Sequence, residues 1–171
     1  EDEFTRLLSE GVPFTRAPAT AMEYSNLGYA ILGRIVANVS KQPYKDFVQR
    51  TLLGPLGMAS TGYDVTAAPA ERRALGYRWQ NGAWKLEPTM AHGAFGAMGG
   101  LQTSAADYAK YVAFLLSAWP ARDGADTGPV RRSSVRELSQ GANFPSLRLR
   151  PGSSGPGACR HAGAYGMGMV V

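Results

Sequence analysis

The chain has 171 residues, of which 44% are hydrophobic and only 18% are charged. This length allows one hydrophobic core and is too short for two independent ones. The 21 Gly and 11 Pro residues indicate a compact body with long loops. The net charge of +5 raises the question of nucleic-acid binding. The arginines are scattered without a dense basic run or an aromatic platform, so ordinary solvation is favoured and no nucleic acid is expected as a partner.

Cys159 is the single cysteine, which excludes an internal disulfide and a cysteine-based zinc site. His92 and His161 alone form a poor metal-binding set, and Cys159 has no clear base partner, so no metal or cofactor is predicted. No apolar run approaches the roughly 18 to 20 residues of a membrane span. The acidic start, Glu1 to Phe4, is unlike a signal peptide. Localisation is therefore left open by the residues.

The ends suggest that the chain is an internal piece of a larger protein. It has no initiator Met, and it stops at residues 169–171 within a strand-like run. We therefore expect further N-terminal and C-terminal segments of the same protein as its partners.

Apolar residues at helical spacing predict several helices. In the second of them, either Ser25 or Asn26 could cap the N-terminus, while Gly28 and Gly33 suggest close packing against a neighbour. The expected helices span residues 2–10, 26–39, 44–52, 104–119 and 132–140.

Strand signals are fewer. Residues 75–79 and 83–87 are aromatic-rich and flank Asn81-Gly82, a pair that favours a tight hairpin turn. Turns are expected over 57–74 and a loop rich in Gly, Pro and Ser over 141–163. Residues 165–171 are expected to form a final strand.

The helix over 104–119 has the clearest pattern. Ser104 is its expected cap, with Asp107 three residues on, and its apolar stripe is expected to be core. The Gly-rich stretch before it, residues 91–103, lacks the order of residues that a phosphate-binding loop requires, so phosphate binding is not favoured.

Tyr24 and Asn26 carry most of the functional information. In an extended stretch, residues two apart project to the same side, so a phenol and a carboxamide could line one wall of a cleft. Such a wall could position a substrate amide and move a proton. The alternative is structural: a packed tyrosine ring and a helix cap, with Ser25 as a cap or wall residue. No Ser or Thr stands three residues before a Lys, so no activated nucleophile is recognisable.

A series of motifs in order then carries a resemblance. Tyr24-Ser25-Asn26 precedes a Leu-Gly-Tyr-x-x-Leu-Gly helix and is followed by Pro55-Leu56-Gly57-Met58 and by Gly99-Gly100-Leu101 with Ser104. Over about residues 12–119 the chain resembles the serine beta-lactamase superfamily, in particular the branch of class C beta-lactamases, D-alanyl-D-alanine carboxypeptidases of the penicillin-binding type and related esterases.

The resemblance implies a fold and a division of the chain. It implies a mainly α fold, namely the helical domain of a beta-lactamase-like α/β serine hydrolase, with a small β-hairpin and a C-terminal strand from the α/β domain. Residues 1–163 would form the helical domain with its loops, and residues 164–171 would be the first strand of the α/β domain.

The family uses three catalytic elements, and the resemblance carries over only the second. These elements are Ser-x-x-Lys, Tyr-x-Asn, and Lys or His-x-Gly on a sheet strand. Tyr24 and Asn26 would be catalytic, with Asn26 and Ser25 binding substrate. His161-Ala162-Gly163 is a weaker candidate for the third element, because it precedes the expected strand instead of following it.

Two functions remain open. The first is part of a serine hydrolase that acylates and hydrolyses a β-lactam, a D-amino-acid peptide or an ester, inactive without its nucleophile. The second is a catalytically silent relative that serves as a binding or interaction module. The resemblance also implies a periplasmic or secreted location, because the family is largely exported.

Overall fold

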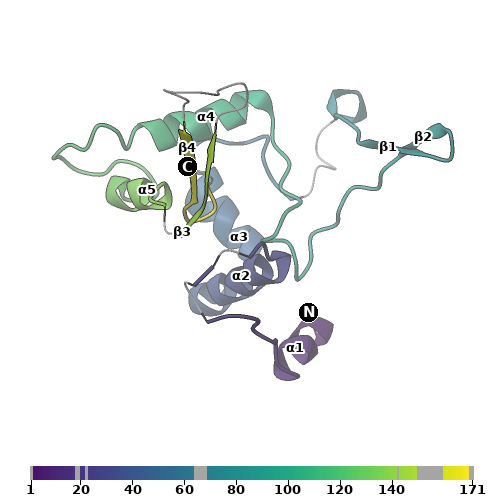
Figure 1. The fold of residues 1–171 in the computed structure, drawn as a ribbon. Helices are drawn as coiled ribbons and strands as arrows, with labels where there is room; N and C mark the ends of the chain where they lie inside the picture. Colours follow the sequence, from purple (N-terminus) through teal and green to yellow (C-terminus); the bar gives the residue numbers. More distant parts are fainter. Residues whose placement is uncertain are drawn as a thin grey trace. The chain divides into compact units, whose positions relative to one another are not determined.

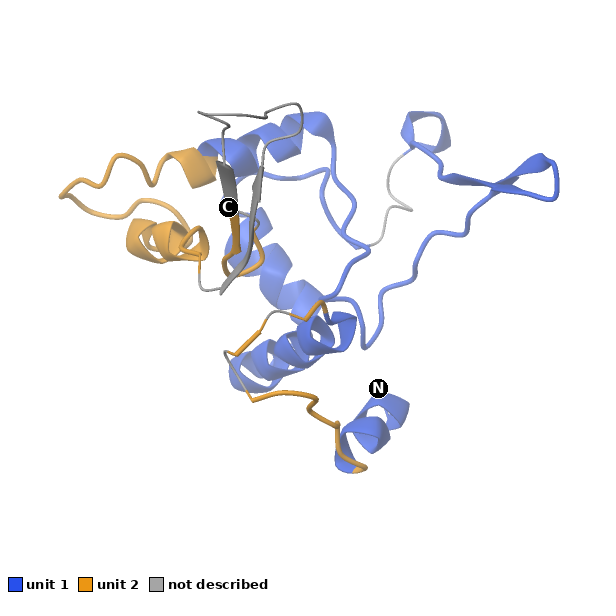
Figure 2. Cartoon of the chain, viewed as in Figure 1, with its two compact units in different colours: residues 1–9, 25–113 blue, residues 10–24, 114–171 orange. Residues whose placement is uncertain are grey.

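The computed structural model describes residues 2–17, 20–21, 23–63, 69–141, 143–149 and 160–169. By their internal contacts the residues group into two compact units, Glu1–Ser9 with Ser25–Ala113, and Glu10–Tyr24 with Phe114–Val171 (Figure 2). Helices predominate in the described part, with a small hairpin and a C-terminal strand, which confirms the predicted fold class (Figure 1). None of the helices described is both long and apolar enough to cross a bilayer.

The first unit contains α1 (Asp2–Ser9) and α2 (Asn26–Ser40). In α1, Phe4 is buried and packs edge-to-face on Phe95, with ring centroids 5.3 Å apart. In α2, Gly33 lies so close to Ala97 that an added Cβ would sit 2.4 Å from the Ala97 Cβ. The expected close packing is therefore present at Gly33. At Gly28 an added Cβ would meet only the cap residue Ser25.

The helix expected over 44–52 is present in two parts. α3 (Tyr44–Val48) continues directly into a short π-helix, η1 (Gln49–Leu53). Its last residue, Leu53, is buried, as is Met58 after the following turn. Pro43 precedes the first turn, where its missing N–H costs no helical hydrogen bond.

The predicted hairpin is confirmed. β1 (Tyr77–Gln80) pairs antiparallel with β2 (Ala83–Leu86), and Trp79 lies opposite Trp84 with ring centroids 5.3 Å apart. Asn81 (φ 51°) and Gly82 (φ 76°) both have positive φ, as the tight turn requires. All eight strand residues are exposed. Among the described residues of the region expected to hold only turns, 57–63 and 69–74, lies a short 3-10 helix, η3 (Ala70–Arg72).

The apolar stripe on α4 (Ala105–Leu116) was expected to be core but is only partly buried, with Tyr111, Val112 and Leu115 half-buried. Tyr108 is 56% exposed and Leu116 is 64% exposed, whereas the buried residue of this helix is Asp107, at 3%. Helical spacing places apolar residues on one face, but it does not supply the surface that would cover that face. The expected cap is confirmed, because the Ser104 hydroxyl accepts a hydrogen bond of 3.2 Å from the Asp107 N–H.

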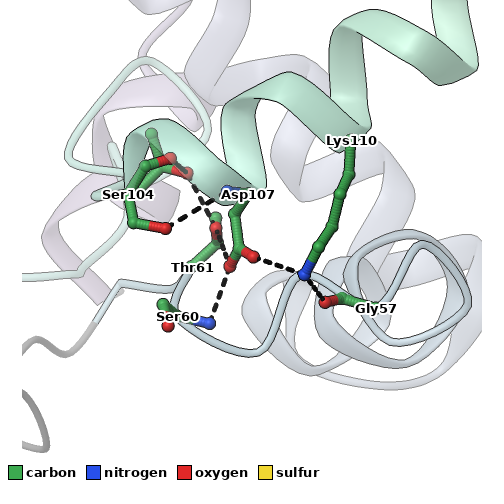
Figure 3. A network of polar contacts seen from close by, with 7 residues as sticks. Gly57, Ser60, Thr61, Ser104, Asp107 and Lys110 are labelled. Atoms are coloured by element: carbon green, nitrogen blue, oxygen red, sulfur yellow. Dashed lines mark hydrogen bonds and ion pairs between the residues drawn. The ribbon is translucent and has the colours of Figure 1, made fainter.

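The Asp107 carboxylate ties α4 to the segment that follows η1, residues 57–61 (Figure 3). Its Oδ2 accepts hydrogen bonds from the Ser60 N–H at 2.7 Å and from the Thr61 hydroxyl at 2.9 Å. Its Oδ1 pairs with Lys110 Nζ at 2.8 Å, and Lys110 also donates to the Gly57 carbonyl. A carboxylate can be buried here because three donors replace its water.

The second unit is built around α5 (Arg132–Leu138). Val135 is 2% exposed, Ala118 is fully buried, and Arg136 donates to the Ala118 carbonyl at 2.8 Å. Gly166 fits against the end of α5, since an added Cβ would lie 2.3 Å from the Leu138 carbonyl oxygen.

The end of the chain differs from the sequence-based expectation. β3 (Asn143–Leu149) pairs antiparallel with β4 (Arg160–Tyr165), so part of the expected 141–163 loop is sheet. The final strand ends at Tyr165 instead of spanning 165–171, and residues 166–169 turn back, with the Gly166 N–H donating to the Met169 carbonyl at 2.8 Å. Glycine and serine content predicted a loop, but strand pairing supplies hydrogen bonds that composition does not reveal.

Candidate functional site

Ser25 caps the N-terminus of α2. Its backbone is extended, with φ −141° and ψ 109°, and its hydroxyl oxygen accepts a hydrogen bond of 2.9 Å from the Gly28 N–H. This satisfies one of the donors that a helix start leaves unpaired. Of the two possible caps, the structure therefore uses Ser25, and the Asn26 side chain is not required for that purpose.

Asn26 is the first residue of α2 and is exposed. Because Ser25 caps the helix, the Asn26 carboxamide keeps two N–H donors and one carbonyl acceptor for another group. A carboxamide on the first turn of a helix is also held at a fixed point of the backbone. It is thus suited to orienting a ligand carbonyl.

Tyr24 ends the segment that precedes α2, and its ring is 77% exposed. The residue before it, Glu23, accepts a hydrogen bond from the Thr15 hydroxyl at 2.8 Å and pairs with Arg16 at 3.2 Å. These contacts fold the preceding loop back on itself, although exposed ion pairs hold such a loop only weakly. The phenol is therefore open to solvent and is not enclosed among aliphatic side chains.

The extended backbone at Ser25 is the feature that relates Tyr24 to Asn26. Side chains on either side of an extended residue project to the same side of the chain. A phenol can donate or accept a proton, and a carboxamide can donate to a carbonyl without ionising.

Lys110 does not supply a cationic partner for such a site. Its ammonium is held by Asp107 and by the Gly57 carbonyl, so its role is to fasten α4 to the turn after η1.

His161-Ala162-Gly163 lies within β4, where these residues face Arg148, Leu147 and Ser146 across the sheet. The expectation that the tripeptide precedes a strand is thus wrong, because it forms part of one. A sheet strand is the kind of element on which the third family motif is placed.

One cluster was not recognised from the sequence. His92, expected to be a loop or packing residue, lies 4.7 Å from Tyr63 between ring centroids, and Tyr63 is 6.1 Å from Tyr44. Burial, followed by the hydrogen bond with Tyr44, raises the pKa of the Tyr63 phenol. These residues are far apart in sequence and carry no common motif, so only their packing reveals them.

Comparison with known proteins identifies the family of the chain. The model of the family described as Beta-lactamase matches residues 3–171. The "Beta-lactamase-like protein 2" of Dictyostelium discoideum is 35% identical over 100 residues, which cover 57% of this chain and 18% of that protein.

Two solved structures share the fold. The octameric penicillin-binding protein homologue from Pyrococcus abyssi has a TM-score of 0.70 and 22% identity, and the match covers 98% of this chain and 33% of that one. The D-alanine carboxypeptidase AmpC from Burkholderia cenocepacia has a TM-score of 0.67 and 19% identity, over 98% of this chain and 41% of that one. The chain thus spans less than half the length of these relatives. Because the family model matches residues 3–171, the chain belongs to the Beta-lactamase family.

Proposed function

We propose that this chain supplies the Tyr-x-Asn element of a serine hydrolase that forms an acyl-enzyme with a β-lactam, a D-amino-acid peptide or an ester. The observation that carries the proposal is the junction at Ser25: an extended residue between an exposed phenol and a helix-starting carboxamide that the cap leaves unused. The family match and the fold support it.

In this proposal the nucleophilic serine comes from a part of the polypeptide outside these 171 residues. Its oxygen attacks the substrate carbonyl carbon, the bond to the leaving nitrogen or oxygen breaks, and the serine proton ends on the leaving atom. The Asn26 amide hydrogens orient the acyl side of the substrate. The Tyr24 hydroxyl takes part in the proton transfer, with Ser25 holding the backbone between the two.

The proposal is tested by covalent labelling of a longer polypeptide that contains this chain, with a fluorescent penicillin and a fluorophosphonate as probes. Tyr24→Phe should slow acylation by about 10² to 10⁴-fold, the usual contribution of a general acid or base. Asn26→Ala should slow it by about tenfold, as expected for the loss of one orienting hydrogen bond.

Tyr77→Phe is the matched control, because Tyr77 is an exposed tyrosine on the hairpin strand β1. It should leave labelling unchanged. The isolated 171-residue chain should acquire no adduct, as read by intact mass. A stoichiometric acyl adduct on that chain would contradict the proposal, and so would equal labelling rates for Tyr24→Phe and Tyr77→Phe. A longer polypeptide that takes no label would identify a silent relative.

A further inference from the structure

A pocket of about 490 Å³ lies within the first unit, beside the second half of α2. Its walls come from three places: Phe4 of α1, residues 33–44 of α2 and the turn after it, and residues 92–97. It is distinct from the Tyr-x-Asn junction. At a rise of 1.5 Å per residue, Asn26 at the start of α2 and Asn38 beside the pocket are about 18 Å apart along the helix axis.

Close backbone packing builds the walls. The contact between Gly33 and Ala97 leaves no room for a Cβ, and an added Cβ on Gly96 would lie 2.3 Å from the His92 ring. Phe4 is fixed by its edge-to-face contact with Phe95. The backbone on these two sides of the pocket is therefore fixed by close packing, as expected of a preformed ligand site.

The charged side chains that line the pocket are positive. Arg34 and Lys41 line the pocket, together with the amides of Asn38 and Gln42, and no Asp or Glu is among the described residues that line it. The Arg34 guanidinium also donates to the Thr5 hydroxyl at 3.4 Å, which holds it at the wall. Lys41 ends α2 in a left-handed conformation (φ 57°), and its backbone N–H is already bonded to the Ala37 carbonyl. The helix end is thus closed by the backbone itself, and the ammonium is not needed to cap it.

His92 adds hydrogen-bonding capacity that the fold does not use. Its ring lines the pocket, and its Nδ1 is buried without a partner in the described part of the chain. Buried polar atoms of proteins are nearly always paired, so an unpaired one at a pocket wall calls for an explanation. Phe4, Ala37 and Pro43 contribute apolar atoms to the lining of the same pocket.

We propose that this pocket binds a small organic anion, namely a carboxylate on a compact apolar or aromatic body. The carboxylate is recognised by Lys41 and Arg34, with the amides of Asn38 and Gln42 as further donors, because a cationic wall without acidic residues favours an anion. The apolar body lies against Phe4 and Ala37. This ligand site goes beyond the proposed hydrolase function and does not depend on it.

Benzoate is the test ligand, because it joins a carboxylate to a compact ring. The neutral amide benzamide and the cation benzylamine have nearly the same shape. Titrations of the 171-residue chain are followed by ¹H–¹⁵N chemical shifts. Benzoate should produce saturable shifts in the amides of Asn38, Gln42 and Gly93, whereas benzamide should bind more weakly and benzylamine should not saturate.

Two variants of equal charge separate a specific site from general attraction to a basic protein. Lys41→Gln should weaken benzoate binding by about three- to fivefold, the size expected for one partly exposed ion pair. Lys85→Gln removes the same charge from the exposed hairpin strand β2 and should leave the affinity unchanged. Ala37→Trp, which fills the pocket, should abolish the saturable shifts, with far-UV circular dichroism confirming that the helices remain.

Three results would overturn the proposal: shifts at these amides that do not saturate with benzoate, equal affinities for benzoate and benzamide, or equal effects of Lys41→Gln and Lys85→Gln. Because the readout is binding and not acylation, the outcome is independent of the hydrolase test.

Discussion

Thr61→Val removes one hydrogen-bond donor from the buried Asp107 carboxylate and nearly preserves side-chain shape. Thr61 is buried, and its hydroxyl lies 2.9 Å from Asp107 Oδ2 and 2.8 Å from the Thr103 hydroxyl. Since Thr61 has one hydroxyl hydrogen and gives it to Asp107, Thr103 must be the donor in the second contact. The substitution therefore leaves Asp107 one donor short, whereas the Thr103 hydroxyl keeps the Ser104 carbonyl, 3.3 Å away, as an acceptor.

The size of the stability loss follows from the hydrogen bonds that Asp107 keeps. Asp107 keeps Ser60 and Lys110 as partners, so the loss corresponds to about one buried hydrogen bond, about 1 to 2 kcal/mol in the free energy of unfolding. For a chain of this size that lowers the thermal midpoint by about 2 to 8 °C.

The effect should also depend on pH. The Lys110 ammonium, with the Thr61 hydroxyl and the Ser60 amide, holds the pKa of Asp107 below its usual value, although burial opposes this. A lowered folded-state pKa stabilises the fold fully above the unfolded-state pKa of about 3.9, and this stabilisation is lost as the pH falls through the folded-state pKa. Valine raises the folded-state pKa, so the difference between Thr61→Val and wild type should be largest at neutral pH and narrow below about pH 4.

Thermal unfolding followed by circular dichroism, from neutral pH to about pH 3, measures both effects. Thr51→Val is the matched control, because the Thr51 hydroxyl donates only to the Phe47 carbonyl one helical turn earlier. Such local bonds contribute little. A Thr61→Val midpoint equal to that of Thr51→Val, or a difference that does not change with pH, would refute the role assigned to the Asp107 network.

Three further outcomes are expected. Gly33→Ala should lower the free energy of unfolding by about 1 to 3 kcal/mol, because its Cβ would collide with Ala97. Gly28→Ala, in the same helix, should be neutral or stabilising by up to about 1 kcal/mol. Urea unfolding compares the two variants, and equal effects would contradict the close contact at Gly33. Ser25→Ala should lower the free energy of unfolding by about 1 kcal/mol, because α2 loses its cap. Ser25→Asp should restore the stability in the same urea assay. An unfolding midpoint of Ser25→Ala equal to that of the wild type would rule out the cap. Because burial raises the pKa of Tyr63, ultraviolet titration of tyrosinate should show an ionisation step at high pH that disappears in Tyr63→Phe. The free energy of unfolding should fall as the pH rises above the unfolded-state tyrosine pKa of about 10. Persistence of the high-pH step in Tyr63→Phe would assign it to another tyrosine.

Local signals predicted most of the elements correctly. Asn81-Gly82 specified the hairpin because few other residue pairs adopt two successive positive φ angles. Ser104 and Ser25 capped the helices expected to follow them, because a hydroxyl next to a helix start satisfies N–H groups that are close in sequence. Each of these features depends on residues within a few positions of one another.

Non-local features were missed or misjudged. Asp107 seemed to belong to a local capping motif, yet its carboxylate binds Ser60 and Thr61, more than 40 positions earlier in the chain. The pairing of β3 with β4 was hidden in a segment whose composition indicated a loop. The pocket combines Phe4, the second half of α2 and His92, which no sequence window contains together.

The sequence alone determined the family resemblance, the helices of the first unit and the hairpin, because spacing, caps and turn residues act within a few residues of the backbone. It also singled out the Tyr24–Asn26 pair, which stays a prediction. Only the tertiary structure decided that Asp107 is buried, that the α4 stripe is partly exposed, and that Arg34, Lys41 and His92 share one pocket. Burial and electrostatic environment depend on which distant segments come together, and a one-dimensional pattern specifies which face of an element is apolar without specifying what covers it.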